Sequence, residues 1–168
     1  MPEKLNLCWK WVSKMLGAVR LNQAVMDLLV KYRFNKLTEA QIKAIPLILD
    51  GYNVLLVAPT GSGKTEAAIL PVFSKILDSK ESNLGILAIY VTPLRALNRD
   101  ILYRIIRFGR ELGIRIEVRH GDTSQSDRRR QSYCPPEILI TTPETLQAIL
   151  PGKRMKKHLA SVRWVIID

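Results

Sequence analysis

The sequence predicts an α/β fold in which helices cover both faces of a parallel sheet. From Asn53 onward, short runs rich in Val and Ile alternate with longer stretches of helical periodicity. Strands that alternate with helices in this way are typical of βαβ units, which build parallel sheets. Several of the runs are apolar at consecutive positions, and this pattern indicates strands that are buried on both faces.

The expected elements follow this alternation along the chain. Before Asn53 we expect one helix over residues 22–32 and another that starts at Thr38 and kinks or ends at Pro46, because proline lacks a backbone N–H. The basic stretch Gly152–His158 is expected to form a loop. The predicted strands are Val54–Ala58, Ile86–Thr92, Ile114–Arg119, Ile138–Thr141 and Trp164–Ile167. The predicted helices between the strands cover about 64–78, 95–112, 124–132 and 143–150.

Residues 1–20 are expected to form a separate amphipathic helix ahead of one domain at 21–168. Apolar residues recur there at three- and four-residue spacing, at Leu5, Trp9, Val12, Leu16 and Val19. Such a helix can pack on the core of its own domain. It can also lie on a membrane surface or a partner.

Length and charge limit the class of protein. A chain of 168 residues is long enough for one domain with a real core. No apolar stretch reaches the length of about 18 residues that a membrane helix needs, so we expect a cytoplasmic protein without a membrane partner. Cys8 and Cys134 make neither a disulfide scaffold nor a metal site. The net charge of +11 favours a polyanionic partner, although it also serves solubility.

The segment Ala58-Pro59-Thr60-Gly61-Ser62-Gly63-Lys64-Thr65 predicts a phosphate site. It lies between a predicted strand and a predicted helix, which is the context of a P-loop. Gly61 and Gly63 permit backbone conformations that let successive N–H groups turn toward phosphate oxygens. Lys64 is expected to reach the β- and γ-phosphates, and the Thr65 hydroxyl is expected to bind Mg²⁺. Small-molecule kinases, GTPases and motor ATPases all use such a loop, so it does not name a reaction by itself.

Further blocks along the chain resemble one family. The chain is similar to the first motor domain of superfamily 2 DExH-box helicases, in the large helicase-related (Lhr-type) branch, from about Leu21 to Asp168. The blocks that carry the resemblance are Phe34 with Leu37–Gln41, residues 58–65, Thr92–Asn98, His120–Thr123 with Arg128–Arg130, Thr141–Leu146 and Val165–Asp168. The resemblance implies a P-loop NTPase fold with a RecA-like sheet and an ATP-dependent helicase activity.

The resemblance also implies roles for residues outside the P-loop. Gln41 would read adenine, since an amide carries donors and an acceptor. Phe34 or Tyr32 would stack on the base, while a core role for Phe34 is an equal alternative. Asp168 would hold Mg²⁺ through water and share the catalytic role with Lys64, with Mg²⁺ and ATP as cofactors.

Two blocks are expected to contact the nucleic-acid backbone. The first is Pro93, Arg95 and Ala96, at the start of a helix where backbone amides can hold a phosphate. The second is Thr142, Pro143 and Glu144, in which Thr142 donates to phosphate and Glu144 caps the next helix. Such contacts read phosphate rather than bases, and DNA is favoured over RNA as the partner. Arg99 and Arg110 can belong to this contact or to a solvated face. The remaining basic residues, Arg128–Arg130 and Lys153, Arg154, Lys156 and Lys157, are interpreted as solvated surface.

The family also has features beyond the last residue of this sequence. There, a Glu that activates water follows the equivalent of Asp168, and a motif III strand and a second motor domain come later. We therefore expect this chain on its own to show no meaningful ATPase activity. We also expect strands 54–58 and 164–167 to be either separated by a gap or collapsed together. A module that binds nucleotide or nucleic acid without turnover, and a P-loop kinase, are the alternative functions.

Overall fold

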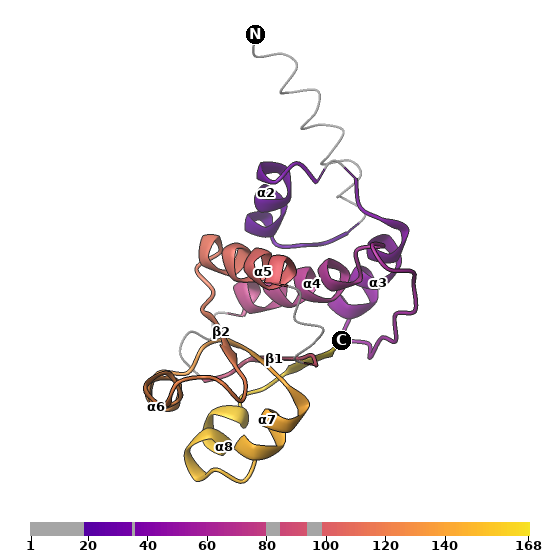
Figure 1. Cartoon of the computed structure of the whole chain (residues 1–168). Coiled ribbons are helices and arrows are strands. Elements are labelled where there is room, and N and C mark those ends of the chain that lie inside the picture. The colour runs from indigo at the N-terminus through magenta and orange to yellow at the C-terminus, as the bar shows by residue number, and fades with distance from the viewer. Residues whose placement is uncertain (1–18, 35, 80–84, 94–98) are drawn as a thin grey trace. The chain divides into compact units, whose positions relative to one another are not determined.

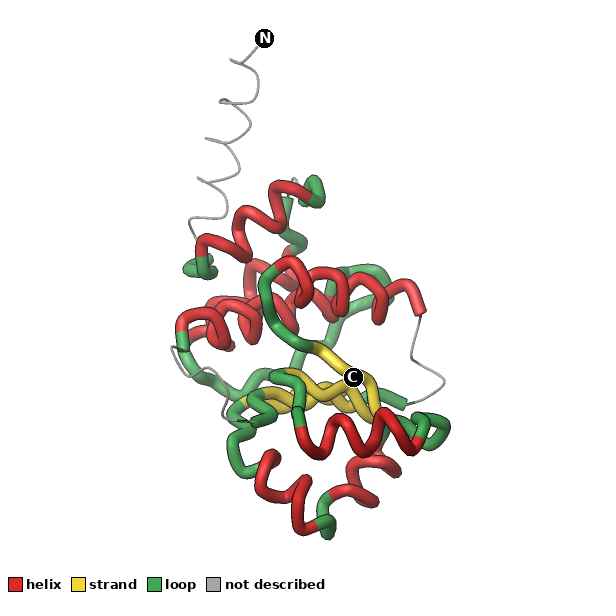
Figure 2. The backbone as a smooth tube through the Cα atoms, turned by 90° about the vertical axis from the view of Figure 1, so that its left-hand side faces the viewer, coloured by secondary structure: helices red, strands yellow, loops and turns green. Residues whose placement is uncertain are grey.

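The computed structural model describes residues 19–34, 36–79, 85–93 and 99–168. The chain divides into two compact units, Met1–Asp78 and Ser79–Asp168, called the first and the second unit below. Figures 1 and 2 show the elements of both units. The predicted helix of residues 1–20 lies almost wholly outside the described residues. Arg95 and Ala96 also lie outside them.

The first unit is helical. Helix α3 packs along α4, and α2 also contacts α4. Asn22 joins α2 to α4, because its backbone N–H donates to Ser74 Oγ (2.6 Å) and its side-chain amide donates to Asp78 Oδ1 (2.6 Å). The helices are α2 (Gln23–Lys31), α3 (Glu39–Leu49) and α4 (Lys64–Asp78), close to the ranges that the sequence predicts.

Helix α3 begins with a reciprocal cap. The Thr38 hydroxyl accepts from the backbone N–H of Gln41 (3.3 Å), and Gln41 Oε1 accepts from the backbone N–H of Thr38 (2.9 Å). This capping box satisfies two N–H groups that have no partner inside the helix. Of the two expected outcomes at Pro46, a kink or an end, the helix does not end there. It continues to Leu49.

The predicted strand Val54–Ala58 is wrong. Residues 52–59 have no regular secondary structure, and Leu55 and Val57 are 91% and 86% exposed. A strand exists only where a neighbour takes its N–H and C=O groups, and no strand in the described part of the chain pairs with this segment. An apolar run therefore did not suffice to specify a strand.

The second unit contains the predicted parallel sheet. The described strands lie in the order β2-β3-β1-β4, and all of the pairs are parallel. The strands are β1 (Ala88–Val91), β2 (Ile116–Arg119), β3 (Ile138–Thr141) and β4 (Trp164–Ile167). The helices are α5 (Arg99–Glu111), α6 (Gln125–Tyr133), α7 (Pro143–Ile149) and α8 (Lys153–Leu159). Strand β4 pairs with β1.

Helices cover both faces of this sheet. On one face, Ile89 and Leu139 pack in a core cluster with Ile149 of α7 and Met155 of α8. On the other face, α5 contacts β2. Their approach is close, since a side chain at Gly109 would overlap Ile116. Figure 1 shows α5 on one side of the strands and α7 and α8 on the other.

The stretch expected as a basic loop is helix α8. Met155 is 5% exposed and packs in the core cluster, and Leu159, one turn later, packs against the same cluster. Two apolar residues at i and i+4 lie on the same face of a helix, and here they pack that face against the core cluster. The spacing was missed in the sequence because most of the residues around it are lysine or arginine. In the described residues, no helix is both long and apolar enough to cross a membrane.

Candidate nucleotide and nucleic-acid sites

The glycine-rich segment forms a loop that runs directly into α4. Gly61 and Gly63 have positive φ angles of 75° and 80°, a region that side chains rarely adopt. Lys64 opens α4, and its ammonium group donates to the carbonyl oxygens of Ala58 (2.6 Å) and Pro59 (2.9 Å). The ammonium group of Lys64 therefore lies at the beginning of the loop.

The N-terminus of α3 holds the loop from one side. Thr38 Oγ1 donates to the carbonyl oxygen of Ser62 (2.7 Å), and Gln41 Nε2 donates to that of Gly63 (3.2 Å). The C=O and N–H of a trans peptide unit point in opposite directions. The N–H groups of Gly63 and Lys64 therefore point away from α3. Sequence reasoning missed this contact, although the Thr-x-x-Gln capping pattern marks the helix end that makes it.

The loop has the chemistry of an anion site. Two of its N–H groups share an orientation at the N-terminus of α4, where the helix dipole favours negative charge. The hydroxyl of Ser62 is buried without a hydrogen-bond partner in the described structure. Ser62, Lys64 and the loop amides are all donors, so this donor set fits phosphate oxygens.

Of the candidate base-reading residues, Gln41 lies beside the loop. Gln41 is 2% exposed, and both ends of its amide are used within the first unit, on Thr38 and on Gly63. Phe34 and Tyr32 are half-buried, and the Lys31 ammonium lies 6.0 Å from the centre of the Tyr32 ring. Gln41 thus acts as a brace between α3 and the loop, while Phe34 and Tyr32 belong to the segment between α2 and α3.

Asp168 lies in the second unit, directly after β4. Its Oδ2 accepts from the hydroxyl of Tyr90 on β1 (2.6 Å), and its backbone N–H donates to the carbonyl of Val91 (2.9 Å). Two bonds to the neighbouring strand therefore fix an exposed carboxylate at the carboxyl end of the sheet. The Tyr90 partner was not foreseen, because strand pairing brings it close and sequence spacing does not.

The candidate backbone-binding residues follow neighbouring strands. Val91 of β1 is paired with Thr141 of β3, so Pro93 and Thr142 lie at the same, carboxyl edge of the sheet. The Thr142 side chain caps α7, since its hydroxyl accepts from the N–H of Thr145 (3.3 Å) and donates to Thr145 Oγ1 (3.1 Å). The expected cap, Glu144, instead lies exposed in the first helical turn after the exposed Pro143.

The sequence analysis interpreted Arg128 as a solvated surface residue, and the structure corrects this interpretation. Its guanidinium group donates to the carbonyls of His120, Gly121 and Thr123. One side chain thus closes the turn between β2 and α6. Burial and the charge of Arg128 lower the pKa of the nearby Arg119 guanidinium.

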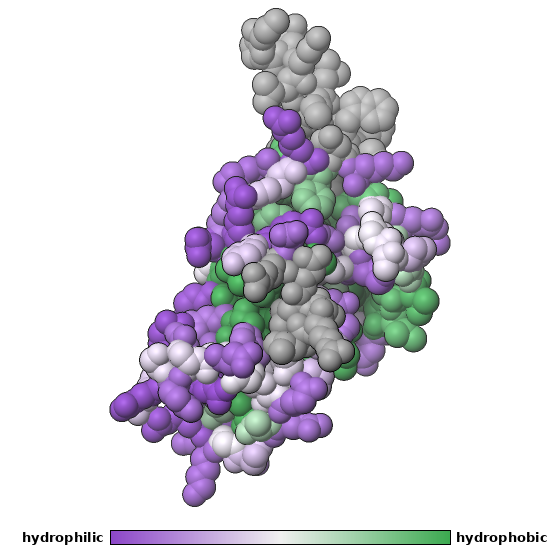
Figure 3. Space-filling view, in the orientation of Figure 1, coloured by the Kyte–Doolittle hydropathy of each residue, from purple (hydrophilic) through white to green (hydrophobic). Residues whose placement is uncertain are grey.

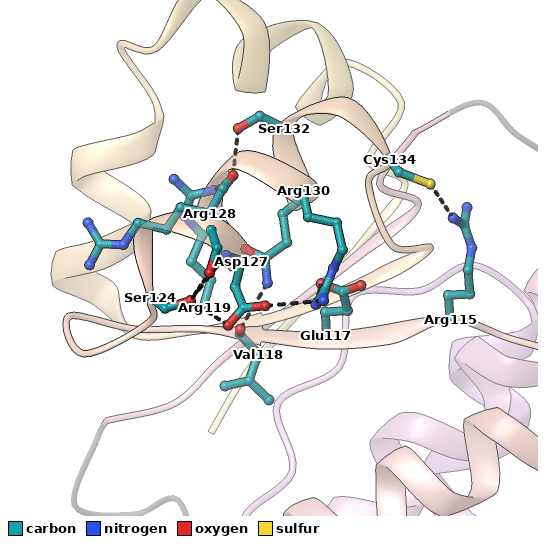
Figure 4. Close-up of polar contacts among 12 residues, drawn as sticks. Arg115, Glu117, Val118, Arg119, Ser124, Asp127, Arg128, Arg130, Ser132 and Cys134 are labelled. Carbon is teal, nitrogen blue, oxygen red and sulfur yellow. Dashed lines mark hydrogen bonds and ion pairs between the residues drawn. The ribbon is translucent and has the colours of Figure 1, made fainter.

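Arg130 is exposed, as that interpretation expects, and it also pairs with carboxylates. It donates to Glu117 (3.3 Å) and lies 3.1 Å from Asp127 Oδ1. Its hydrogen bond to Glu117, and then the charges of Glu117 and Asp127, raise its pKa (Figure 4). Arg129 is exposed as well and, within the described structure, forms no ion pair.

Comparison with known proteins decides the family. The sequence pattern described as "DEAD/DEAH box helicase" matches residues 38–168, most of the chain. The chain belongs to the DEAD/DEAH box helicase family. Over 149 residues, this helicase domain is 43% identical to the "ATP-dependent helicase Lhr-Core" of Methanothermobacter thermautotrophicus, covering 80% of this chain and 17% of that protein.

Solved structures agree with this assignment. The helicase domain resembles the Mycobacterium smegmatis helicase Lhr bound to ssDNA and AMP-PNP, with a TM-score of 0.75 and 36% identity over 91% of this chain and 20% of that one. It resembles the DEAD-box helicase Mss116 bound to ssRNA and UDP-BeF, with a TM-score of 0.80 and 26% identity over 94% of this chain and 32% of that one. The predicted family and RecA-like fold are thus confirmed. The domain spans about a sixth of the length of the Lhr-Core relatives.

Proposed function

We propose that this helicase domain binds ATP and a nucleic-acid strand, and that it contributes both sites to a motor that couples ATP hydrolysis to movement along the strand. One observation carries the proposal: α3 fixes the carbonyls of the glycine-rich loop, so that its amides point away as an anion cradle. Bound AMP-PNP and ssDNA in the structure of the Lhr relative support the same pair of ligands.

In this proposal, the triphosphate lies on the loop from Thr60 to Thr65. Lys64 exchanges the carbonyls of Ala58 and Pro59 for phosphate oxygens, which offer its ammonium group full charges in place of dipoles. Gln41 is proposed to contribute to adenine recognition, and Phe34 or Tyr32 to stack on the base. Thr65 would bind Mg²⁺ through its hydroxyl oxygen, a type of ligand that this hard cation prefers. Asp168 is proposed, from the family resemblance, to hold Mg²⁺ through water. Bound magnesium would neutralise charge on the phosphates.

The nucleic acid is proposed to contact the carboxyl edge of the sheet, at Pro93, Arg95 and Ala96 and at Thr142–Glu144. Phosphate contacts suit a motor, because they bind any sequence equally. We favour DNA over RNA, since the Lhr helicase was solved with ssDNA and is more similar in sequence than the ssRNA-bound Mss116.

Nucleotide binding is tested by ligand-induced stabilisation of the chain. With Mg²⁺ and a non-hydrolysable ATP analogue at a hundred times Kd, the free energy of unfolding should rise by about 2.7 kcal/mol. Lys64→Ala should remove most of this gain, because the loop then lacks its cation. Lys75→Ala, on the same helix, is the matched control and should keep it. An equal gain in wild type and Lys64→Ala would refute the proposed site.

The motor part of the proposal is tested on the full gene product. Single-stranded DNA should raise its ATP turnover, and Lys64→Ala should abolish the turnover with and without DNA. Single-stranded RNA of the same sequence tests the preference between the two polymers. ATP turnover that neither polymer changes would favour a nucleotide enzyme of another class, such as a kinase.

A further inference from the structure

A second basic surface lies away from the proposed nucleic-acid contacts. It combines one turn of α6 with the outer side of α8 and is called the α6–α8 surface here. Its members are Arg129 and Tyr133 of α6 and Lys153, Arg154, Lys156 and Lys157 of α8, and all of them are exposed. Figure 3 shows mainly hydrophilic side chains at the lower end of the molecule, where Figure 1 places α7 and α8.

Contacts between the two helices hold this surface together. The Arg154 guanidinium lies over the Tyr133 ring, 4.3 Å from its centre, within the range of a cation–π interaction. The imidazole Nε2 of His158 lies 3.0 Å from the carbonyl oxygen of Ser132, in hydrogen-bond contact. On the inner side of α8, Met155 is buried in the core cluster. The outward direction of the lysines is therefore fixed by packing on one side and by contact with α6 on the other.

The positive charge of this surface is not neutralised within the described structure. Arg129, Lys153, Arg154, Lys156 and Lys157 form no ion pair with a described carboxylate, and residues 151–163 contain no Asp or Glu. The neighbouring Arg130 differs, because it contacts both Glu117 and Asp127. A surface that served solubility alone would gain from interspersed charges of both signs, whereas here a single sign is concentrated.

The surface is also separate from the motif residues. The carbonyl of His158 in α8 accepts from the N–H of Ile86 (3.1 Å), which precedes β1. The last turn of α8 thus lies at the amino edge of the sheet, whereas Pro93 and Thr142 follow the carboxyl ends of their strands. A strand of four residues separates the two edges by roughly 13 Å.

We propose that the α6–α8 surface binds the sugar–phosphate backbone of the nucleic acid as a second contact, independent of base sequence. The inference rests on the proposed function for the identity of the polymer. Lysine and arginine side chains without carboxylate partners bind phosphates and release counterions from the polymer. Tyr133 adds an aromatic ring, 61% exposed, beside the cations. A long nucleic-acid strand would reach both the motif residues at the carboxyl edge of the sheet and the α6–α8 surface. A short one would occupy the motif residues alone.

The test compares two variants of equal charge. One carries Lys153→Gln, Lys156→Gln and Lys157→Gln, and the control carries Lys31→Gln, Lys36→Gln and Lys43→Gln in the first unit. Affinity for single-stranded DNA of about 8 and about 30 nucleotides is measured by fluorescence anisotropy over a range of salt concentrations. Each lost phosphate contact should reduce the slope of log K against log salt by about 0.7, so the α8 variant should lose about 2 for the long strand. The control should keep the wild-type slope.

The outcomes separate this inference from the function on which it rests. An α8 variant with the wild-type slope for the long strand overturns the second contact, while wild-type binding of both strands leaves the proposed function intact. Failure of wild type to bind either strand overturns the proposed function and the second contact together. Displacement of the long strand by polyglutamate of equal charge, as effectively as by unlabelled DNA, would show that the surface prefers acidic proteins and would also overturn the proposal.

Discussion

At the scale of single residues, Gly63 is the most crowded position of the phosphate loop. A side chain there would overlap Gln41 Nε2 and come within 3.2 Å of Gln41 Cδ, whereas a side chain at Gly61 would meet nothing within 4 Å. Both glycines have positive φ angles, so the two positions differ in space and not in backbone conformation. Substitutions at the two positions can therefore separate the effect of limited space from the effect of a positive φ angle.

Gly63→Ala should therefore weaken ATP-analogue binding and stability more than Gly61→Ala. Each substitution carries the cost of a left-handed alanine, about 1–2 kcal/mol, but only Gly63→Ala displaces Gln41 from the loop. Chemical denaturation and analogue titration measure the two effects. Adding Gln41→Ala should recover part of the loss in Gly63→Ala and none in Gly61→Ala. Equal losses in the two single variants would show that the Gln41 contact has no role.

The residue types of the loop were predictable, whereas their partners were not. Glycine spacing and the Lys64-Thr65 pair point to phosphate from the sequence alone. The Tyr90–Asp168 bond and the three carbonyls held by Arg128 depend on strand pairing and turn geometry. An arginine that closes a turn and an arginine in solvent are the same residue type. The sequence alone therefore could not distinguish the two environments.

At the scale of elements, helix α3 depends on Thr38 twice. The Thr38 hydroxyl caps the helix by accepting from Gln41 N–H, and it donates to the carbonyl of Ser62 in the loop. A hydroxyl can do both, since it has one donor and two acceptor sites. The start of α3 and the course of the loop are thus coupled at one side chain.

Thr38→Ala should lower the free energy of unfolding by about 1 kcal/mol, the usual cost of a lost N-cap. It should also weaken ATP-analogue binding, because the carbonyl of Ser62 loses its donor. Thr38→Ser keeps the hydroxyl and should restore both properties, as denaturation and titration will show. Loss of stability with unchanged analogue affinity would limit Thr38 to its capping role.

Two elements show where patterns in the sequence misled. Residues 54–58 read as a buried strand but pair with no strand in the described structure, because apolar character cannot supply a hydrogen-bonding neighbour. Residues 153–159 read as a loop but form α8, because two apolar residues one turn apart found a core to pack against. The strands Ile138–Thr141 and Trp164–Ile167 were predicted with correct bounds.

At the scale of the whole molecule, the candidate sites are divided between the two units. The glycine-rich loop, Gln41 and Phe34 belong to the first unit, and Asp168 and Thr142 belong to the second. Along the chain, the expected nucleotide-binding blocks mostly come before the blocks expected to contact nucleic acid. Each ligand should therefore leave its strongest trace on a different part of the chain.

Hydrogen exchange should resolve this division. The ATP analogue should slow exchange at Gly61–Thr65 and the first turn of α4, and a DNA strand should slow exchange at Thr142–Thr145. Bound ligand removes these amides from solvent or stabilises the turns that hold them. Mass spectrometry of peptides from both units provides the measurement. Protection of Gly61–Thr65 by DNA without nucleotide would contradict this assignment of ligands.

The brace between α3 and the phosphate loop has a consequence for engineering. The two donors that aim the loop amides come from residues 22 and 24 positions earlier in the chain. A transplant of residues 58–65 into another scaffold would carry the glycines and the lysine. It would lack the two donors that orient the loop amides. A portable nucleotide-binding segment would therefore need a helix, a loop and a second helix, from Thr38 to Asp78, because Thr38 and Gln41 set the orientation of the loop amides.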